Sequence, residues 1–190
     1  GLRGALINSI NKKLNKNYLI YILFILGAFH WILFSLSGKP AWNSFDWLGT
    51  YPWFDIIRES FLQNKIPYHV TAYDTKVIGD SIATGTNGPF DVRWFSSGFN
   101  ILSPQVLLLY FISVPSFIAF SHVFYFSIGF FGIIKWAKKM NLSLEASCYL
   151  IIILSFNGSI VSRMGVGHLG YCNAYMFVPL YLYLLYSFII

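Results

Sequence analysis

Long uncharged, apolar runs alternate with shorter polar segments along this chain of 190 residues. The first run covers residues 18–36, and in a helix that rises about 1.5 Å per residue it is long enough to cross the hydrocarbon core of a bilayer. The pattern therefore predicts a first transmembrane helix over 18–36. A cleaved signal peptide is the alternative, but the run is long for such a segment and residues 37–40 contain no A-x-A cleavage site. We favour a signal anchor.

A second uncharged stretch, 101–134, is too long for one crossing and too short for two. Pro115 divides it, and a cluster of three lysines follows it at 135–139. If that cluster is cytoplasmic, an odd number of crossings separates it from the loop after the first helix. We therefore expect an interfacial or re-entrant helix at 104–113, transmembrane helices at 116–136, 146–161 and 174–190, and a second outer loop at 162–173.

These elements predict an all-α polytopic membrane protein with about four transmembrane helices, a cytoplasmic tail at 1–17 and a large extracytoplasmic first loop at 37–103. Within that loop, Pro52 stands where the first turn of a helix tolerates proline. Apolar and polar side chains then alternate at helical spacing, with Trp53, Phe54, Ile57 and Phe61 on one face and Asp55, Glu59 and Gln63 on the other. We expect a surface helix over 52–65 whose aromatic face lies towards the lipid headgroups.

Composition agrees with a membrane protein and argues against a water-soluble globule. Hydrophobic residues make up 56% of the chain, aromatic residues 20% and charged residues 11%, and the mean hydropathy is +0.60. An ordinary soluble domain is roughly one quarter charged. The chain begins with Gly1 and ends inside an apolar run at 186–190, so we expect a fragment of a longer protein.

The distribution of charge predicts an orientation. The net charge is +6, and the excess of bases lies before the first apolar run, at 3–16, and in the cluster at 135–139. The segment 38–103 carries five bases and six of the seven acids, which leaves it with a net charge of −1. By the positive-inside rule the amino terminus is cytoplasmic and this segment lies outside. The basic blocks thus reflect membrane topology, and nucleic-acid binding is not expected.

One candidate site lies in the first loop, around Asp46 and the predicted surface helix. A carboxylate at an apolar boundary can have a raised pKa and act as a general base, and it can also bind a divalent cation. A helix cap or a headgroup contact is the simpler alternative for such an aspartate. Asp55 and Arg58 are three residues apart and are expected to pair on the helix surface.

A second candidate site is the glycine-rich segment 162–170. Arg163 and His168 together would suit a phosphate group, with the glycines allowing close approach of the backbone. An arginine that reaches towards water beside a glycine-rich turn explains the same residues equally well. Residues 165–170 match G-x-G-x-x-G, but no βαβ pattern surrounds them, so dinucleotide binding is excluded. His30 and His122, inside apolar runs, are expected to make hydrogen bonds between helices.

The order of these features resembles the amino-terminal part of the GT-C superfamily of polytopic glycosyltransferases, and within it the YfhO-type bacterial membrane proteins. Such proteins carry an Asp, a Tyr shortly after it and a helix that ends at a Lys-x-Pro turn, and Asp46, Tyr51 and residues 65–67 stand in those places here. They also carry a Gly-His pair before a Leu-Pro-Leu segment, which residues 167–174 and 178–180 echo.

The resemblance implies transfer of a sugar, with inversion, from a polyprenyl-phosphate-linked donor to a cell-envelope acceptor at the outer face of a bacterial inner membrane. It implies that Asp46 is the catalytic base and that Asp55 is its substitute. Arg163 and His168 would hold the departing lipid phosphate, and Arg58 and Tyr51 would complete the substrate-binding set. Many relatives place two acids together in this loop, whereas Trp47 adjoins Asp46 here, so no metal or other cofactor is expected.

Two alternatives belong to other functional classes. A non-catalytic GT-C-like protein that assists envelope polymer assembly would keep the fold and lack the chemistry. A transporter is the weaker alternative, because transport favours ionisable residues at mid-membrane and only His30 and His122 qualify. The lipid bilayer and the lipid-linked donor are the expected partners.

Overall fold

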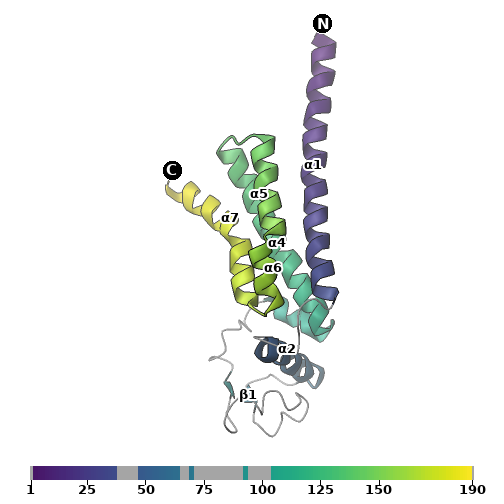
Figure 1. The fold of residues 1–190 in the computed structure, drawn as a ribbon, viewed down its shortest axis with the longest axis vertical. Helices are drawn as coiled ribbons and strands as arrows, with labels where there is room; N and C mark the ends of the chain where they lie inside the picture. The colour runs from purple at the N-terminus through teal and green to yellow at the C-terminus, as the bar shows by residue number, and fades with distance from the viewer. Residues whose placement is uncertain (1, 38–46, 65–68, 71–91, 94–103, 190) are drawn as a thin grey trace. The chain divides into compact units, whose positions relative to one another are not determined.

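A computed structural model describes residues 2–37, 47–64, 69–70, 92–93 and 104–189 (Figure 1). Most of the predicted first loop, including Asp46, lies outside these described residues. The elements, in chain order, are α1 (Leu2–Leu36), α2 (Trp47–Leu62), β1 (His69–Val70), β2 (Val92–Arg93), the 3-10 helix η3 (Pro104–Tyr110), α4 (Val114–Lys139), α5 (Leu144–Phe156), α6 (Gly158–Gly165) and α7 (Leu169–Ile189).

Among the described residues, four helical segments are long and apolar enough to cross a membrane, namely Tyr18–Leu36, Val114–Lys139, Leu144–Gly165 and Leu169–Ile189. The prediction of a helical protein with about four helices of membrane-spanning length and composition is therefore confirmed. Strand structure in the described part of the chain is confined to the antiparallel pair β1 and β2, in which His69 lies opposite Arg93. The seven-residue η3 is far too short to cross a bilayer.

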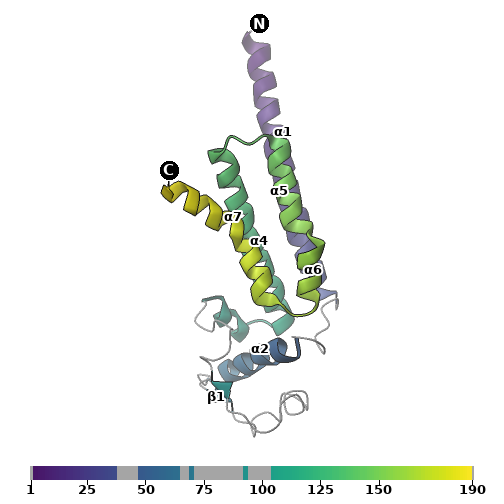
Figure 2. The same cartoon turned by 60° about the vertical axis from the view of Figure 1, so that its left-hand side comes forward.

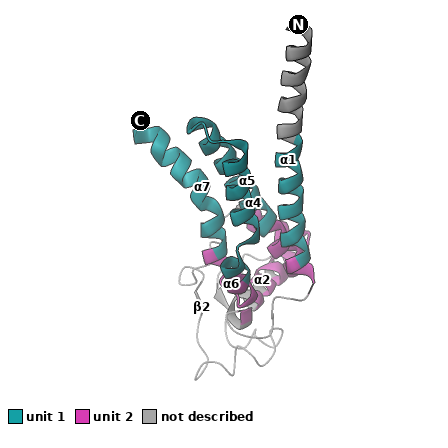
Figure 3. Cartoon of the chain, turned by 45° about the horizontal axis from the view of Figure 1, so that its top comes forward, with its two compact units in different colours: residues 1–33, 122–161, 172–190 teal, residues 34–121, 162–171 magenta. Residues whose placement is uncertain are grey.

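The chain divides into two compact units (Figure 3). Unit 1 contains residues 1–33, 122–161 and 172–190, and unit 2 contains residues 34–121 and 162–171. Most of the transmembrane length belongs to unit 1, whereas α2, η3 and the turn between α6 and α7 belong to unit 2. Both sites predicted from the sequence therefore fall in unit 2.

Aromatic contacts set the direction of α4 relative to α1 within unit 1. The Phe24 ring lies 5.7 Å from the Phe126 ring and 4.9 Å from the Phe130 ring, between centroids. The Trp31 ring, seven residues further along α1, lies 5.5 Å from the ring of His122. Since later residues of α1 meet earlier residues of α4, the two helices are antiparallel.

The other helices of unit 1 continue this alternation (Figure 2). His30 on α1 contacts Phe156 on α5, with ring centroids 5.1 Å apart. On the next pair of helices, the Tyr175 hydroxyl donates to the carbonyl of Ile153 at 3.4 Å and the Cys172 thiol lies 3.6 Å from the carbonyl of Ile160. Consequently α7 runs antiparallel to α5 and α6. An up-and-down order of this kind is what four successive membrane crossings require.

The two intramembrane histidines are packed against aromatic rings. His122 is fully buried against Trp31, and the ring of His30 lies 5.2 Å from that of Trp31. The buried Nε2 atom of His30 has no hydrogen-bond partner within the described part of the chain. The expected hydrogen bond between helices is therefore corrected for His30, whose surroundings are aromatic rings that offer stacking in place of an acceptor.

The predicted span 146–161 is interrupted at Asn157, where α5 ends and α6 begins. The Asn157 side-chain oxygen accepts hydrogen bonds from the backbone N–H groups of Ser159 at 3.0 Å and Ile160 at 3.4 Å. Its side-chain nitrogen donates to the Tyr175 hydroxyl of α7 at 3.3 Å. These bonds matter because a membrane offers no water to a broken helix, and the polar groups released at the break need partners within the protein.

Glycines on α4 let α7 approach closely. A Cβ atom at Gly129 would meet the carbonyl oxygen of Met176, and one at Gly132 would come within 2.6 Å of the Cα atom of Leu180. Both contacts are with backbone, which cannot move aside without shifting the whole helix. The contact region includes Pro179, which lies inside α7 and removes one helical N–H donor. α7 changes direction along its length (Figure 1), as expected for a helix with an internal proline.

The glycine contact gives a stability prediction. Gly132→Ala should lower the thermal unfolding midpoint in detergent or nanodiscs, because the added methyl group forces α7 away, at a cost of about 1 to 3 kcal/mol. Gly170→Ala is the matched control, since a Cβ there meets nothing within 4 Å and alanine favours a helix over glycine. Equal midpoints for the two variants would contradict the close packing of α4 on α7.

Candidate functional site

Helix α2 carries the first candidate site, and it begins at Trp47, earlier than the predicted start at residue 52. The Trp47 side chain is fully buried, and Phe54 and Ile57 are buried as well. The Phe54 ring lies 5.1 Å from the ring of Phe117 in the same unit. The expectation that this face contacts lipid headgroups is therefore corrected, because these apolar side chains pack against protein.

A hydrogen bond from Trp47 joins the two segments that the sequence marked as candidate sites. The indole N–H of Trp47 donates to the carbonyl oxygen of Met164 at 3.0 Å and to that of Gly165 at 3.2 Å. Met164 and Gly165 directly follow Arg163, and Trp47 directly follows Asp46. Segments more than 100 residues apart thus meet in unit 2 through a buried polar contact.

The glycine-rich segment forms a helix cap, followed at once by a new helix. Gly167 has a φ of 101°, which favours glycine. The N–H of Gly167 donates to the carbonyl of Met164 at 3.1 Å, and the N–H of His168 donates to that of Arg163 at 3.0 Å. This is the pattern of a Schellman cap. The predicted outer loop 162–173 is corrected accordingly, since only residues 166–168 separate α6 from α7.

The turn brings Arg163 and His168 together through their backbones. The Arg163 side chain is exposed, and its guanidinium carbon lies 5.8 Å from the centre of the Tyr171 ring. Such a cation–π contact orients the guanidinium while leaving its N–H donors available. The sequence pattern did not point to Tyr171. Arg163 and Tyr171 are eight residues apart, and they become neighbours only because α6 ends and α7 begins between them.

Asp55 and Tyr51 are one helical turn apart on α2, and both are half-buried. Burial raises the pKa of Asp55 above its ordinary value, while the charge of Arg58 opposes this change and that of Glu59 adds to it. Burial also raises the pKa of Tyr51, and the negative charge of Asp55 raises it further. An aspartate with a raised pKa is a better proton acceptor than an ordinary surface carboxylate.

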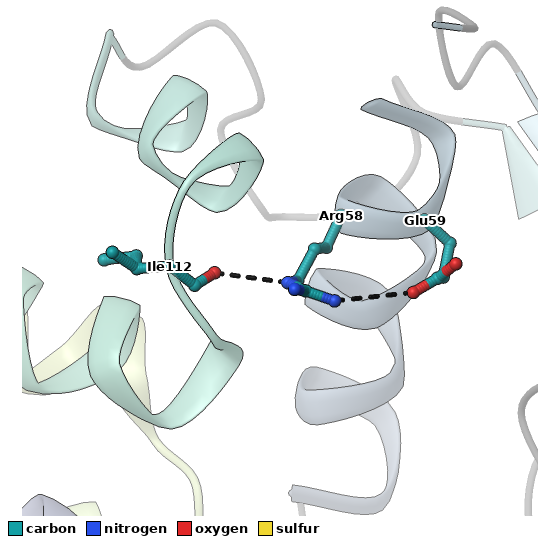
Figure 4. A network of polar contacts seen from close by, with 3 residues as sticks. All are labelled: Arg58, Glu59 and Ile112. Atoms are coloured by element: carbon teal, nitrogen blue, oxygen red, sulfur yellow. Dashed lines mark hydrogen bonds and ion pairs between the residues drawn. The ribbon is translucent and has the colours of Figure 1, made fainter. Parts of the chain in front are cut away.

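Arg58 contacts the chain just after η3 (Figure 4). Its Nε–H donates to the carbonyl of Ile112 at 3.2 Å, and its Nη1 atom lies 3.5 Å from the carboxylate of Glu59. The ion pair joins Arg58 to Glu59, whereas the sequence suggested pairing with Asp55. A partly exposed pair of this kind contributes little stability. These contacts indicate that Arg58 positions α2. They fit this role better than the predicted role as a phosphate ligand.

A cation site has little support among the residues that the structure describes, where no three His, Cys, Asp or Glu side chains gather closely enough to hold a metal ion. Asp46 and the rest of 38–46 lie outside those residues.

The structure brings the predicted site residues together in part. Tyr51, Asp55 and Arg58 share α2, Arg163 and His168 share one turn, and Trp47 connects the helix to the turn.

Comparison of the chain with known protein families, with curated proteins and with solved structures finds no match. Function is therefore argued from the site itself, since a helical membrane fold is compatible with many activities. The arrangement offers a half-buried carboxylate on α2, and on the other segment an exposed guanidinium at the Tyr171 ring, with His168 in the turn that follows α6. The first suits proton transfer and the second suits an anionic group.

The raised pKa of Asp55 gives a prediction about stability and pH. Ionisation of this carboxyl is disfavoured in the folded state, so Asp55→Asn should raise the unfolding midpoint at pH 7. Below about pH 3, where the carboxyl is protonated in folded and unfolded protein alike, the two proteins should unfold together. The difference should grow as pH rises from the unfolded pKa through the higher folded pKa and then stay constant. Thermal unfolding in nanodiscs across about pH 2.5 to 8 measures it.

Glu59→Gln is the control for this series, because it removes a neighbouring acid whose side chain is 44% exposed. It should leave the midpoint at pH 7 nearly unchanged. A lower midpoint for Asp55→Asn at pH 7 would show that the ionised carboxylate is stabilising, contrary to the prediction.

Proposed function

We propose that the chain is part of a membrane glycosyltransferase that moves a sugar from a polyprenyl-phosphate-linked donor to an envelope acceptor. The observation that carries the proposal is the hydrogen bond from Trp47 to Met164 and Gly165. It connects the residue after the candidate base, Asp46, to the residues after the candidate phosphate ligand, Arg163. A transferase needs these two functions close together, since base and leaving group act on the same sugar.

The chemistry assigns a role to each candidate. Asp46, with Asp55 as its substitute, takes the proton from the acceptor hydroxyl, whose oxygen then attacks the anomeric carbon of the donor. The bond from that carbon to the phosphate oxygen breaks, and the lipid phosphate leaves with the electron pair. Arg163 and His168 stabilise the negative charge that grows on this phosphate. The reaction inverts the anomeric carbon and requires no metal in this scheme.

We infer that the protein lies in a bacterial inner membrane with its amino terminus in the cytoplasm. The antiparallel packing of α1 on α4 supports this orientation, because it brings the carboxyl end of α4 to the same end of unit 1 as Tyr18. The basic segment 3–16 directly precedes Tyr18, and the cluster 135–139 ends α4. Both basic blocks then lie on the side that positive charge favours, and the acid-rich first loop predicted at 37–103 belongs to the outer side, where an envelope acceptor would be found.

Asp46→Asn tests the proposed base in the full-length protein. Removal of a general base should reduce sugar incorporation into the surface polymer by at least about 100-fold, with membrane insertion unchanged. Incorporation of labelled sugar by cells, beside the amount of protein in the membrane fraction, measures both quantities. Unchanged incorporation would overturn the assignment, and the non-catalytic role in polymer assembly would then be the better account.

Trp47→Phe tests the connection between the two segments. The variant keeps an aromatic ring and removes the N–H that bonds to Met164 and Gly165, so sugar incorporation should fall by about tenfold. Trp136→Phe is the matched control, because the indole nitrogen of Trp136 is buried without a hydrogen-bond partner in the described part of the chain. Equal activity in the two variants would show that the Trp47 hydrogen bond does not position the site.

A further inference from the structure

The carboxyl end of α4 presents a cluster of exposed lysines, Lys135, Lys138 and Lys139. Helix α4 ends in a cap centred on Asn141, which has a φ of 51°. The N–H of Leu142 donates to the carbonyl of Ala137 at 2.9 Å, as in a Schellman motif. The cap ends the helix sharply and leaves Lys138 and Lys139 in its last turn, where the helix dipole favours cations.

Aromatic rings lie beside two of these lysines. The Lys135 ammonium is 5.0 Å from the centre of the Phe131 ring, one turn earlier on α4. The Lys139 ammonium is 5.9 Å from the centre of the Tyr186 ring on α7. α7 runs parallel to α4 within unit 1, and the contact between Lys139 and Tyr186 joins the last turn of α4 to α7. Lysine stems against aromatic rings at the end of an apolar span are typical of the boundary between hydrocarbon and headgroups.

Charge and apolar surface together indicate the ligand. Glu145 is the single acid in the segment 135–145, which holds all three lysines. Phe131, whose ring lies beside Lys135, exposes 51% of its surface. On α7, close in sequence to Tyr186, Leu185 and Phe188 expose 42% and 92%. A ligand that satisfies both features has an anionic head and long apolar chains. A nucleic acid or a soluble anion would leave the apolar surface uncovered.

We propose that this end of unit 1 binds an anionic phospholipid. The headgroup phosphate lies between Lys138 and Lys139, and the acyl chains run along the apolar surfaces of α4 and α7. Tyr186 marks the level of the headgroup by its contact with Lys139. This site is independent of the proposed transferase chemistry, because it uses none of its residues and lies in the other unit.

Native mass spectrometry of the purified full-length protein tests the proposal. The protein in detergent is mixed with equal amounts of phosphatidylglycerol and phosphatidylcholine, and the bound lipid is counted. Wild type should retain phosphatidylglycerol preferentially. Each lysine near a membrane surface contributes roughly a fivefold preference for an anionic lipid, so Lys138→Gln should lower the ratio several-fold. The triple change of Lys135, Lys138 and Lys139 to Gln should bring the ratio close to one.

Charge-retaining changes provide the control. The triple change of the same lysines to Arg should keep the preference for phosphatidylglycerol, and Glu145→Gln should keep or increase it. High salt should weaken it, because exposed charges are screened. A triple Gln variant that is folded and still prefers phosphatidylglycerol as wild type does would overturn the proposal.

A second experiment distinguishes binding of a phospholipid from binding of a free anion. Phosphatidylglycerol should raise the thermal unfolding midpoint of wild type and not that of the triple Gln variant. Inorganic phosphate at the same ionic strength should raise neither, because it cannot cover the apolar surface. A rise with phosphate equal to that with the lipid, lost in the Gln variant, would overturn the assignment to a phospholipid.

Discussion

Hydrocarbon offers no hydrogen-bond partners, and this constraint accounts for the local structure of the described helices that are long enough to cross a membrane. Helices satisfy their own backbone, so difficulty arises only where a helix ends or breaks. Asn157 and Tyr175 supply partners at the break between α5 and α6. Gly167 and Asn141 each adopt a left-handed conformation that closes the end of a helix. The positions of these few residues therefore determine where the chain can turn.

A similar constraint applies to polar contacts between distant segments, because a group buried inside protein is also shielded from water. A buried indole N–H without an acceptor would be costly, and Trp47 finds two carbonyls at the turn between α6 and α7. That bond connects the segment that follows Asp46 with the segment that follows Arg163, which are the two parts of the proposed site. Asp55 differs from Trp47, because its burial is expected to reduce the stability of the folded protein. Burial disfavours its charge and lowers stability at neutral pH, while the raised pKa that results is useful to a group that accepts a proton.

Charge has two separate uses in this molecule. The exposed lysines at the end of α4 lie at one end of an apolar helix, which is where the proposed phospholipid would bind. In unit 2, Arg58 donates to the carbonyl of Ile112 and holds α2 to the chain after η3. Arg163, held over Tyr171, keeps donors available for an anion. The two arginines of the proposed site thus differ in role although both were expected to bind substrate.

The sequence by itself determined the class of protein, the number of spans and their approximate limits, because an apolar run reveals a membrane span by its own length and hydropathy. It could not determine what the apolar face of α2 contacts, since Phe54 would suit lipid as well as Phe117. Only the tertiary structure decided that Trp47 contacts Met164, that residues 166–168 form a capped turn between two helices and that Gly132 lets α7 approach α4 closely. Each of these features depends on a surface supplied by a distant part of the chain, and the local sequence pattern does not reveal that surface.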